Sequence, residues 1–121
     1  MKKILVIEDH ADIRRLIRMT LEFESCEVHE AANGDEGFDL ALVAKPDLVL
    51  LDVMMPGRLN GLDVCRILKS LKPSPRIILL SARGRSEDLA AGMAAGADTY
   101  LVKPFSPLQL IEQVNLQLEA T

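Results

Sequence analysis

Short, almost entirely apolar runs alternate with amphipathic segments along the chain, and this alternation limits the possible folds more than any other feature. The runs cover residues 4–7, 48–51, 77–80 and 100–102 and are rich in Ile, Val and Leu. A solid apolar run of this length is typical of a parallel strand that helices cover on both faces. A weaker, alternating segment at residues 28–31 predicts a further strand at the edge of the sheet.

The segments between these runs have the spacing and the boundary residues of helices. Asn33, Ser86 and Ser106 are expected N-caps of the second, the fourth and the last helix, while Gly61 is expected to open the third. In the first helix, apolar residues recur three and four positions apart, which predicts one buried face. That face would consist of Ile13, Leu16, Ile17, Thr20 and Leu21.

Five strand–helix units account for the chain. Such alternation predicts an α/β fold in which a doubly wound, five-stranded parallel sheet carries helices on both faces. A chain of 121 residues can bury enough apolar surface to fold without disulfides or metal ions. We therefore expect a single domain over residues 1–121.

Composition narrows the class of protein further. The net charge of −4 and the scattered basic residues argue against direct binding of nucleic acid. The two cysteines, Cys26 and Cys65, lack the spacing of a metal site or a disulfide framework, which favours reduced thiols. The apolar run at the N-terminus is too short for a signal peptide or a membrane span, so we expect a cytoplasmic protein.

Polar residues follow the apolar runs at the points where the strands should end. Glu8 and Asp9 follow the first run, Asp52 the second, Ser81 the third and Lys103 the fourth. Singly, each has an ordinary explanation as a helix cap, a turn former, a partner of a loop amide or a surface charge. Because ligands bind beyond the carboxyl ends of parallel strands, we instead expect all five side chains to converge there.

Three carboxylates in one place repel one another unless a cation lies among them. A hard divalent ion such as Mg²⁺ prefers oxygen ligands and often combines a few carboxylates with phosphate oxygens. The ammonium group of Lys103 would add a second positive charge. The set therefore predicts a site for a divalent cation and a phosphoryl group.

These residues resemble the receiver domain of bacterial two-component response regulators, which belongs to the chemotaxis-regulator-like superfamily. The resemblance covers essentially the whole chain, and it implies the flavodoxin-like strand order 2-1-3-4-5. It is carried by Glu8-Asp9, Asp52 with Pro56 four residues later, Ser81-Ala82, Gly96-Ala97-Asp98, Tyr100 and Lys103-Pro104-Phe105.

The resemblance implies a phosphorylation switch. Asp52 would accept a phosphoryl group from the phosphohistidine of a sensor histidine kinase or a phosphotransfer protein. Mg²⁺, with Mn²⁺ as a substitute, would be held by Glu8, Asp9, Asp52 and the backbone carbonyl of Met54. Apart from its own phosphorylation and dephosphorylation the domain would catalyse nothing, so it would not be an enzyme.

The resemblance also implies which residues would respond to phosphorylation. Ser81 and Lys103 would bind the phosphoryl oxygens, and Pro104 would be a cis-proline. Ser81 and Tyr100 would then act as switch residues. They would change the face built from the fourth helix, the fifth strand and the fifth helix, which would bind a downstream partner, an output domain or a second copy of the chain.

Three details depart from the pattern or leave choices open. The loop at residues 56–61 is one residue longer than usual, and its extra residue would bulge into solvent. Arg83 and Met54 are expected to tune the lifetime of the aspartyl phosphate by controlling access of water, although Arg83 could equally be a solvated charge. His10 follows Asp9 and could be taken for a metal ligand, but it is expected to be an ordinary residue of the first helical turn.

Rival interpretations need features that this chain lacks. A flavodoxin-like electron carrier needs a Ser/Thr/Gly-rich phosphate loop and flanking aromatic residues, whereas the first loop here is acidic. A haloacid-dehalogenase-type phosphatase needs a second aspartate two residues after the nucleophile, where this chain has Met54. A pseudo-receiver, which binds partners without phosphorylation, usually lacks one of the acidic or basic residues present here, and it remains the alternative.

Overall fold

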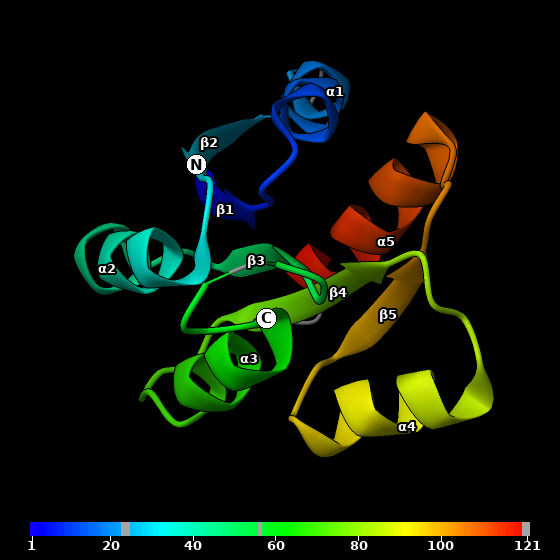
Figure 1. Cartoon of the computed structure of the whole chain (residues 1–121). Coiled ribbons are helices and arrows are strands. Elements are labelled where there is room, and N and C mark those ends of the chain that lie inside the picture. The colour runs from blue at the N-terminus through cyan, green and yellow to red at the C-terminus, as the bar shows by residue number, and fades with distance from the viewer. Residues whose placement is uncertain (23–24, 56, 120–121) are drawn as a thin grey trace.

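The computed structural model describes residues 1–22, 25–55 and 57–119, and within them strands and helices alternate (Figure 1). Pro56, one of the residues that carry the resemblance, lies outside the described residues. The strands are β1 (Lys2–Ile7), β2 (Cys26–Ala31), β3 (Leu48–Asp52), β4 (Arg76–Ser81) and β5 (Thr99–Val102). The helices are α1 (Ala11–Leu21), α2 (Gly34–Ala44), α3 (Gly61–Lys69), α4 (Ser86–Ala94) and α5 (Pro107–Glu119).

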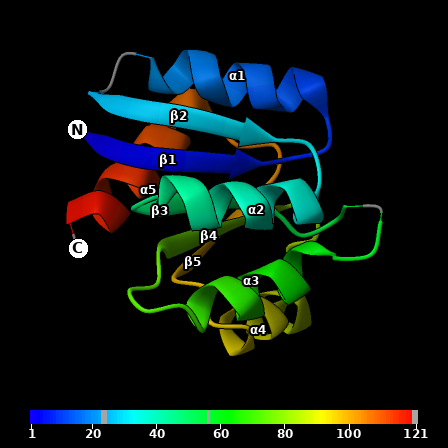
Figure 2. The same cartoon turned by 90° about the vertical axis from the view of Figure 1, so that its left-hand side faces the viewer.

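The five strands form one parallel sheet in the order β2-β1-β3-β4-β5. Helices α1 and α5 cover one face, and α2, α3 and α4 cover the other, as the two views in Figures 1 and 2 show. The fold class and the strand order expected from the sequence are therefore confirmed.

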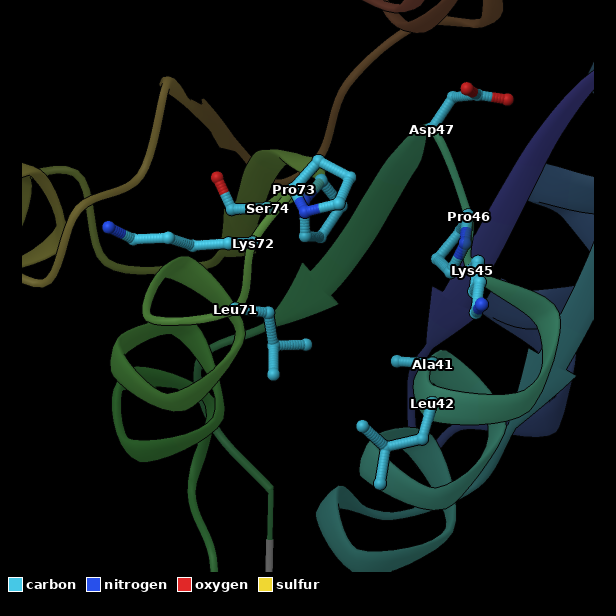
Figure 3. A pocket seen from close by; sticks show the side chains of 10 residues that line it. Ala41, Leu42, Lys45, Pro46, Asp47, Leu71, Lys72, Pro73 and Ser74 are labelled. Atoms are coloured by element: carbon cyan, nitrogen blue, oxygen red, sulfur yellow. The ribbon is translucent and has the colours of Figure 1, made fainter.

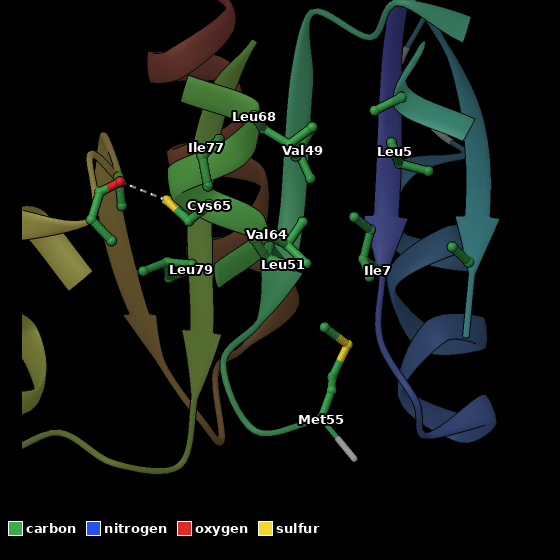
Figure 4. Close-up of a cluster of buried hydrophobic side chains, with 14 residues drawn as sticks. Leu5, Ile7, Val49, Leu51, Met55, Val64, Cys65, Leu68, Ile77 and Leu79 are labelled. Carbon is green, nitrogen blue, oxygen red and sulfur yellow. Dashed lines mark hydrogen bonds between the residues drawn. The ribbon is translucent and has the colours of Figure 1, made fainter. Parts of the chain in front are cut away.

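Alternate residues of each central strand fill two separate cores. Leu5 and Ile7 of β1 point toward α2 and α3, whereas Ile4 and Val6 point toward α1 and α5. Figure 4 shows the first of these cores, where Cys65 Sγ donates a weak hydrogen bond to the carbonyl of Ala95 at 3.5 Å. Because both faces of β1, β3 and β4 are buried, their sequences read as solid apolar runs.

Two of the expected helix starts are confirmed by their hydrogen bonds. Asn33 Oδ1 accepts a hydrogen bond from the N–H of Glu36 at 2.9 Å, which caps α2. Ser106 and Gln109 form a reciprocal capping box at the start of α5, with bonds of 2.8 and 3.1 Å. These caps satisfy amide groups that the first helical turn leaves unpaired.

Two other expectations for the helices were wrong. The N-cap of α4 is Arg85, and Ser86 is the first residue within that helix. Leu16 of α1 is 49% exposed, although Ile17 and Leu21 on the same helix are fully buried. The apolar face of α1 is thus narrower than the sequence spacing suggested, because α1 packs against β1, β2 and α5 with one side and leaves Leu16 exposed to solvent.

Cys26 and Cys65 are thiols that do not form a disulfide with one another, and Cys65 is buried in the core. Burial raises the pKa of the Cys65 thiol to about 11. Within the part of the chain that the structure describes, none of the helices combines the length and the apolar character that crossing a membrane requires.

Candidate functional site

The sheet register brings the polar residues at the strand ends to one edge. Ile7 pairs with Leu51 across β1 and β3, so Glu8 lies beside Asp52. Lys103, which follows β5, reaches across the sheet to both carboxylates. Its Nζ lies 2.6 Å from Glu8 Oε1 and 3.5 Å from Asp52 Oδ1.

Asp52 is almost completely buried, with 1% of its surface exposed. Its Oδ1 accepts a hydrogen bond from the N–H of Met54 at 3.1 Å. Its Oδ2 is buried without any hydrogen-bond donor. Burial, together with the neighbouring Glu8, raises the pKa of Asp52 to about 7, because a charged carboxylate without solvent or full pairing is unfavourable.

Glu8 is also fully buried, yet its pKa is shifted in the opposite direction from that of Asp52. Burial alone would raise its pKa, but the hydrogen bond from Lys103 and the other hydrogen bonds to the carboxylate outweigh burial and lower the pKa to about 2. Glu8 Oε2, on the side away from Lys103, accepts a hydrogen bond from the backbone N–H of His10 at 3.2 Å. Of these two neighbouring buried carboxylates, Glu8 is therefore the one that stays ionised.

Asp9 and His10 complete the acidic side of the site. The Nδ1 atom of His10 lies 3.2 Å from Asp9 Oδ1 and 3.1 Å from Glu8 Oε2. The hydrogen bond to Glu8, followed by the charge of Asp9, raises the pKa of His10. Asp9 Oδ1 is buried and receives no well-aligned hydrogen bond.

The donor set fits a divalent cation. One ligand atom each from Glu8, Asp9, His10 and Asp52 lies within 4.8 Å of the others. Hard cations such as Mg²⁺ and Mn²⁺ favour carboxylate oxygens. Three residues of this cluster, Glu8, Asp9 and Asp52, supply such oxygens. Asp52 Oδ2 independently supports a bound cation. A buried oxygen without a partner costs free energy of folding unless something pairs with it.

The predicted switch residues are connected through the backbone of Arg83. The N–H of Arg83 donates a hydrogen bond to Ser81 Oγ at 3.1 Å, and Ser81 is fully buried. The hydroxyl of Tyr100 donates to the carbonyl of Arg83 at 2.9 Å. The peptide bond between Lys103 and Pro104 is cis.

The structure describes two larger cavities. One, of about 440 Å³, is lined by Met54 and Arg83 and also by Val53, the residue that follows Asp52 in the chain. The other, of about 420 Å³, lies at the amino ends of β3 and β4, where the end of α2 faces the segment after α3 (Figure 3). The first cavity is lined by Met54 and Arg83, the two residues that were expected to control access of water, whereas the second lies at the other end of the strands.

The extra residue in the loop after β3 was expected to bulge into solvent. Within the described part of this loop, Arg58 extends outward, with its side chain 78% exposed, and pairs with Asp35 at 2.7 Å. Asn60 ends the loop by capping α3, with Asp63 as its return partner. The loop therefore departs from the sheet without disturbing the contacts of Asp52.

Two residues that shape the site were not identified from the sequence. Arg14 donates a 2.8 Å hydrogen bond to the carbonyl of Glu8 and a 3.4 Å bond to that of Asp9, so it fixes the loop that carries both acids. Gly61 packs so closely on β3 that an added Cβ would lie 2.2 Å from the carbonyl oxygen of Asp52. A scattered arginine and a turn-like glycine have ordinary local explanations, and only the tertiary structure shows these contacts.

Comparison with known proteins identifies a family to which the chain is similar. The model of the response regulator receiver domain family matches residues 4–115. The chain is 48% identical over 116 residues to the transcriptional regulatory protein ResD of Bacillus subtilis, covering 96% of this chain and 48% of ResD. It is 42% identical over 119 residues to SrrA of Staphylococcus aureus, covering 98% of this chain and 48% of SrrA.

Solved structures give the same result. The receiver domain of the Francisella response regulator 1452 superposes with a TM-score of 0.92 at 32% identity, covering 99% of this chain and 98% of that one. The BeF3-activated N-terminal receiver domain of RstA from Klebsiella pneumoniae superposes with a TM-score of 0.89 at 31% identity, covering 97% and 98%. The chain spans about half the length of the curated relatives described above.

Proposed function

The chain belongs to the response regulator receiver domain family, whose general function is phosphorylation-driven switching in two-component systems, and on this premise we propose that Asp52 is its phosphoryl acceptor. The observation that carries the proposal is the buried side chain of Asp52. Its Oδ1 lies 3.5 Å from Lys103 Nζ, and its Oδ2 has no hydrogen-bond donor among the residues that the structure describes. A carboxylate oxygen held in this way is available as a nucleophile.

In the proposed reaction, a carboxylate oxygen of Asp52 attacks the phosphorus of a phosphohistidine on a sensor kinase or a phosphotransfer protein. The new O–P bond forms as the N–P bond breaks, and the histidine nitrogen leaves with the electron pair. Because such transfers depend mainly on positioning and on neutralising charge, the ammonium group of Lys103 contributes by pairing with a phosphoryl oxygen.

A divalent cation, Mg²⁺ or Mn²⁺ in its place, would be held by Glu8, Asp9, Asp52 and the backbone carbonyl of Met54. When bound, this ion would supply positive charge to the phosphoryl oxygens. Arg14 holds the carbonyls of Glu8 and Asp9 and thereby keeps both acids oriented toward Asp52.

The output of the proposed switch follows from the charge of the new group. A phosphoryl group brings about −1.5 to −2 charges and three strong acceptor oxygens. Ser81 Oγ would turn toward one of these oxygens, and Tyr100 would change its position. The face of α4, β5 and α5 would then change its affinity for a downstream partner, an output domain or a second copy of the chain. In this scheme the domain acts in the cytoplasm and has no substrate besides its own phosphoryl group.

The experiment is measurement of intact mass after incubation with acetyl phosphate and Mg²⁺. The proposal predicts a gain of one phosphoryl group in the native chain, lost on adding a chelator and absent in Asp52→Asn. Failure of the folded native chain to gain the group, both with acetyl phosphate and with a phosphorylated kinase, would overturn the proposal in favour of a pseudo-receiver.

A further inference from the structure

His10 has a conformation that neither its place in the helix nor the general function explains. It occupies the N-cap position of α1 with extended backbone angles, φ −83° and ψ 113°, but its side chain makes no capping hydrogen bond. The ring instead turns back to the acidic cluster. Its Nδ1 lies 3.1 Å from Glu8 Oε2 and 3.2 Å from Asp9 Oδ1.

The two oxygens of the Glu8 carboxylate have different partners. Oε1 is engaged by Lys103 at 2.6 Å, whereas Oε2 faces His10. An imidazole nitrogen and oxygens of three carboxylate side chains thus lie within 4.8 Å of one another. Asp52 belongs to the same group, and its Oδ2 is buried without a partner among the described residues, which independently favours a bound cation.

A nitrogen donor changes which ion such a cluster prefers. Carboxylate, carbonyl and water oxygens suit Mg²⁺, Ca²⁺ and Mn²⁺, whereas imidazole suits Zn²⁺, Cu²⁺, Ni²⁺ and Fe²⁺. For a given set of nitrogen and oxygen ligands, affinity also rises from Mn²⁺ through Co²⁺ and Ni²⁺ to Cu²⁺. A site with oxygen ligands alone would gain less from this order than one with an imidazole.

We propose that His10 supplies an imidazole nitrogen to the ion held by Glu8, Asp9 and Asp52, and that it thereby shifts the preference of the site from Mg²⁺ toward transition-metal ions. This inference rests on the cation site of the proposed function and adds a residue that determines its metal specificity. His10 is suited to the role because its side chain is 63% exposed and its Nδ1 already faces Glu8 and Asp9.

The test is a titration with Co²⁺ alone and with Mg²⁺ alone, without any phosphoryl donor, at about pH 8, where an imidazole is mostly neutral. Binding of Co²⁺ is followed by its visible absorption bands and by calorimetry, and binding of Mg²⁺ by calorimetry. The variants are His10→Ala and His29→Ala. The chain has two histidines, and His29 lies on β2, paired with Glu27 at 2.7 Å and outside the acidic cluster.

The proposal predicts that His10→Ala weakens Co²⁺ binding at least tenfold, since even the groups that support metal ligands are worth about 10- to 100-fold in affinity. The affinity for Mg²⁺ should change by less than about threefold, because Mg²⁺ seldom takes nitrogen ligands. The Co²⁺ bands should also shift in this variant, and His29→Ala should leave both affinities and the bands unchanged.

Three outcomes would overturn the proposal. Unchanged Co²⁺ affinity in His10→Ala would show that the ring is not a ligand. An equal change for both ions would show that His10 acts only through charge. Absence of binding of either ion to the folded native chain would remove this inference and the cation site of the proposed function together, whereas the first two outcomes leave that site intact.

Discussion

The ionised form of Asp52 is unfavourable for folding because its charge is buried. Between about pH 4 and pH 7 the folded chain keeps a proton on Asp52 that the unfolded chain releases, since folding raises the pKa from 3.8 to about 7. A raised carboxyl pKa contributes stability at low pH, and this contribution is lost as the pH rises toward 7. Above that range, the ionised carboxylate opposes folding until a cation or a phosphoryl group changes its surroundings.

Replacement of Asp52 by asparagine should therefore stabilise the metal-free chain. At about pH 8 we expect a gain in the free energy of unfolding on the order of 3 kcal/mol. Urea denaturation of both proteins should show this gain shrinking toward zero as the pH falls to about 4. Saturating Mg²⁺ should stabilise the native chain more than Asp52→Asn. A gain that is independent of pH would contradict the role of the buried charge.

Met54 and Arg83 line a cavity together with Val53, the residue after Asp52. We expect water to reach an aspartyl phosphate from this side. We expect Met54→Ala and Arg83→Ala each to change the rate of dephosphorylation by roughly threefold or more, which corresponds to about 0.7 kcal/mol of barrier. The decay of the phosphorylated mass with time measures this rate. Asp35→Ala, which alters a surface ion pair with Arg58, is the control; unchanged rates in both cavity variants would remove the idea.

The start of α3 is pressed against the end of β3. The N–H of Gly61 donates to the carbonyl of Val53 at 3.1 Å. A Cβ on Gly61 would lie 2.2 Å from the carbonyl oxygen of Asp52 and 2.6 Å from the Cα of Val53. The absence of a side chain at this position therefore allows the helix to begin directly beside the acceptor.

Gly61→Ala tests this contact against ordinary helix propensity. Propensity alone predicts that alanine stabilises the first turn of a helix, whereas the overlap predicts a loss of about 1–3 kcal/mol and a lower yield of phosphorylation. The matched control is Gly84→Ala, whose added Cβ would lie 3.2 Å from side-chain atoms of Val102 and should be tolerated. A Gly61→Ala protein as stable as the native chain would disprove the steric account.

The strands could be predicted from their solid apolar runs. The site could be predicted from the polar residues that follow these runs, because parallel strands end at the same edge of the sheet. The limits of prediction lie where tertiary contacts decide. Leu16 has the right spacing for burial but is half exposed to solvent. Arg14 reaches back to loop carbonyls, and His10 turns from its capping position to the acids. Neither contact follows from a helical or strand period.

At the scale of the whole domain, two hydrogen bonds connect Ser81, at the end of β4, with Tyr100 of β5 through the loop that follows β4. Ser81 Oγ holds the N–H of Arg83, and the carbonyl of Arg83 holds the hydroxyl of Tyr100. If Ser81 turns toward a phosphoryl oxygen, the Arg83 peptide groups lose a partner and Tyr100 is released with them. The proposed switch thus links Asp52 to the face of α4, β5 and α5 through one residue's backbone.

Tyrosine fluorescence can follow this step, because Tyr100 is the only tyrosine and the chain has no tryptophan. Phosphorylation by acetyl phosphate should change the intensity of Tyr100 and its quenching by acrylamide. Ser81→Ala should still accept the phosphoryl group but lose most of this change. An equal fluorescence response in phosphorylated Ser81→Ala would show that Tyr100 moves independently of Ser81.

We propose that Asp52 carries the phosphoryl group, and the modified residue can be identified directly by chemical reduction. Borohydride reduces an aspartyl phosphate to homoserine, which tandem mass spectrometry assigns to a single position. After treatment with acetyl phosphate and Mg²⁺, the account predicts homoserine at position 52 and nowhere else in the chain. Homoserine at position 9, or a modified side chain elsewhere with position 52 unchanged, would contradict it.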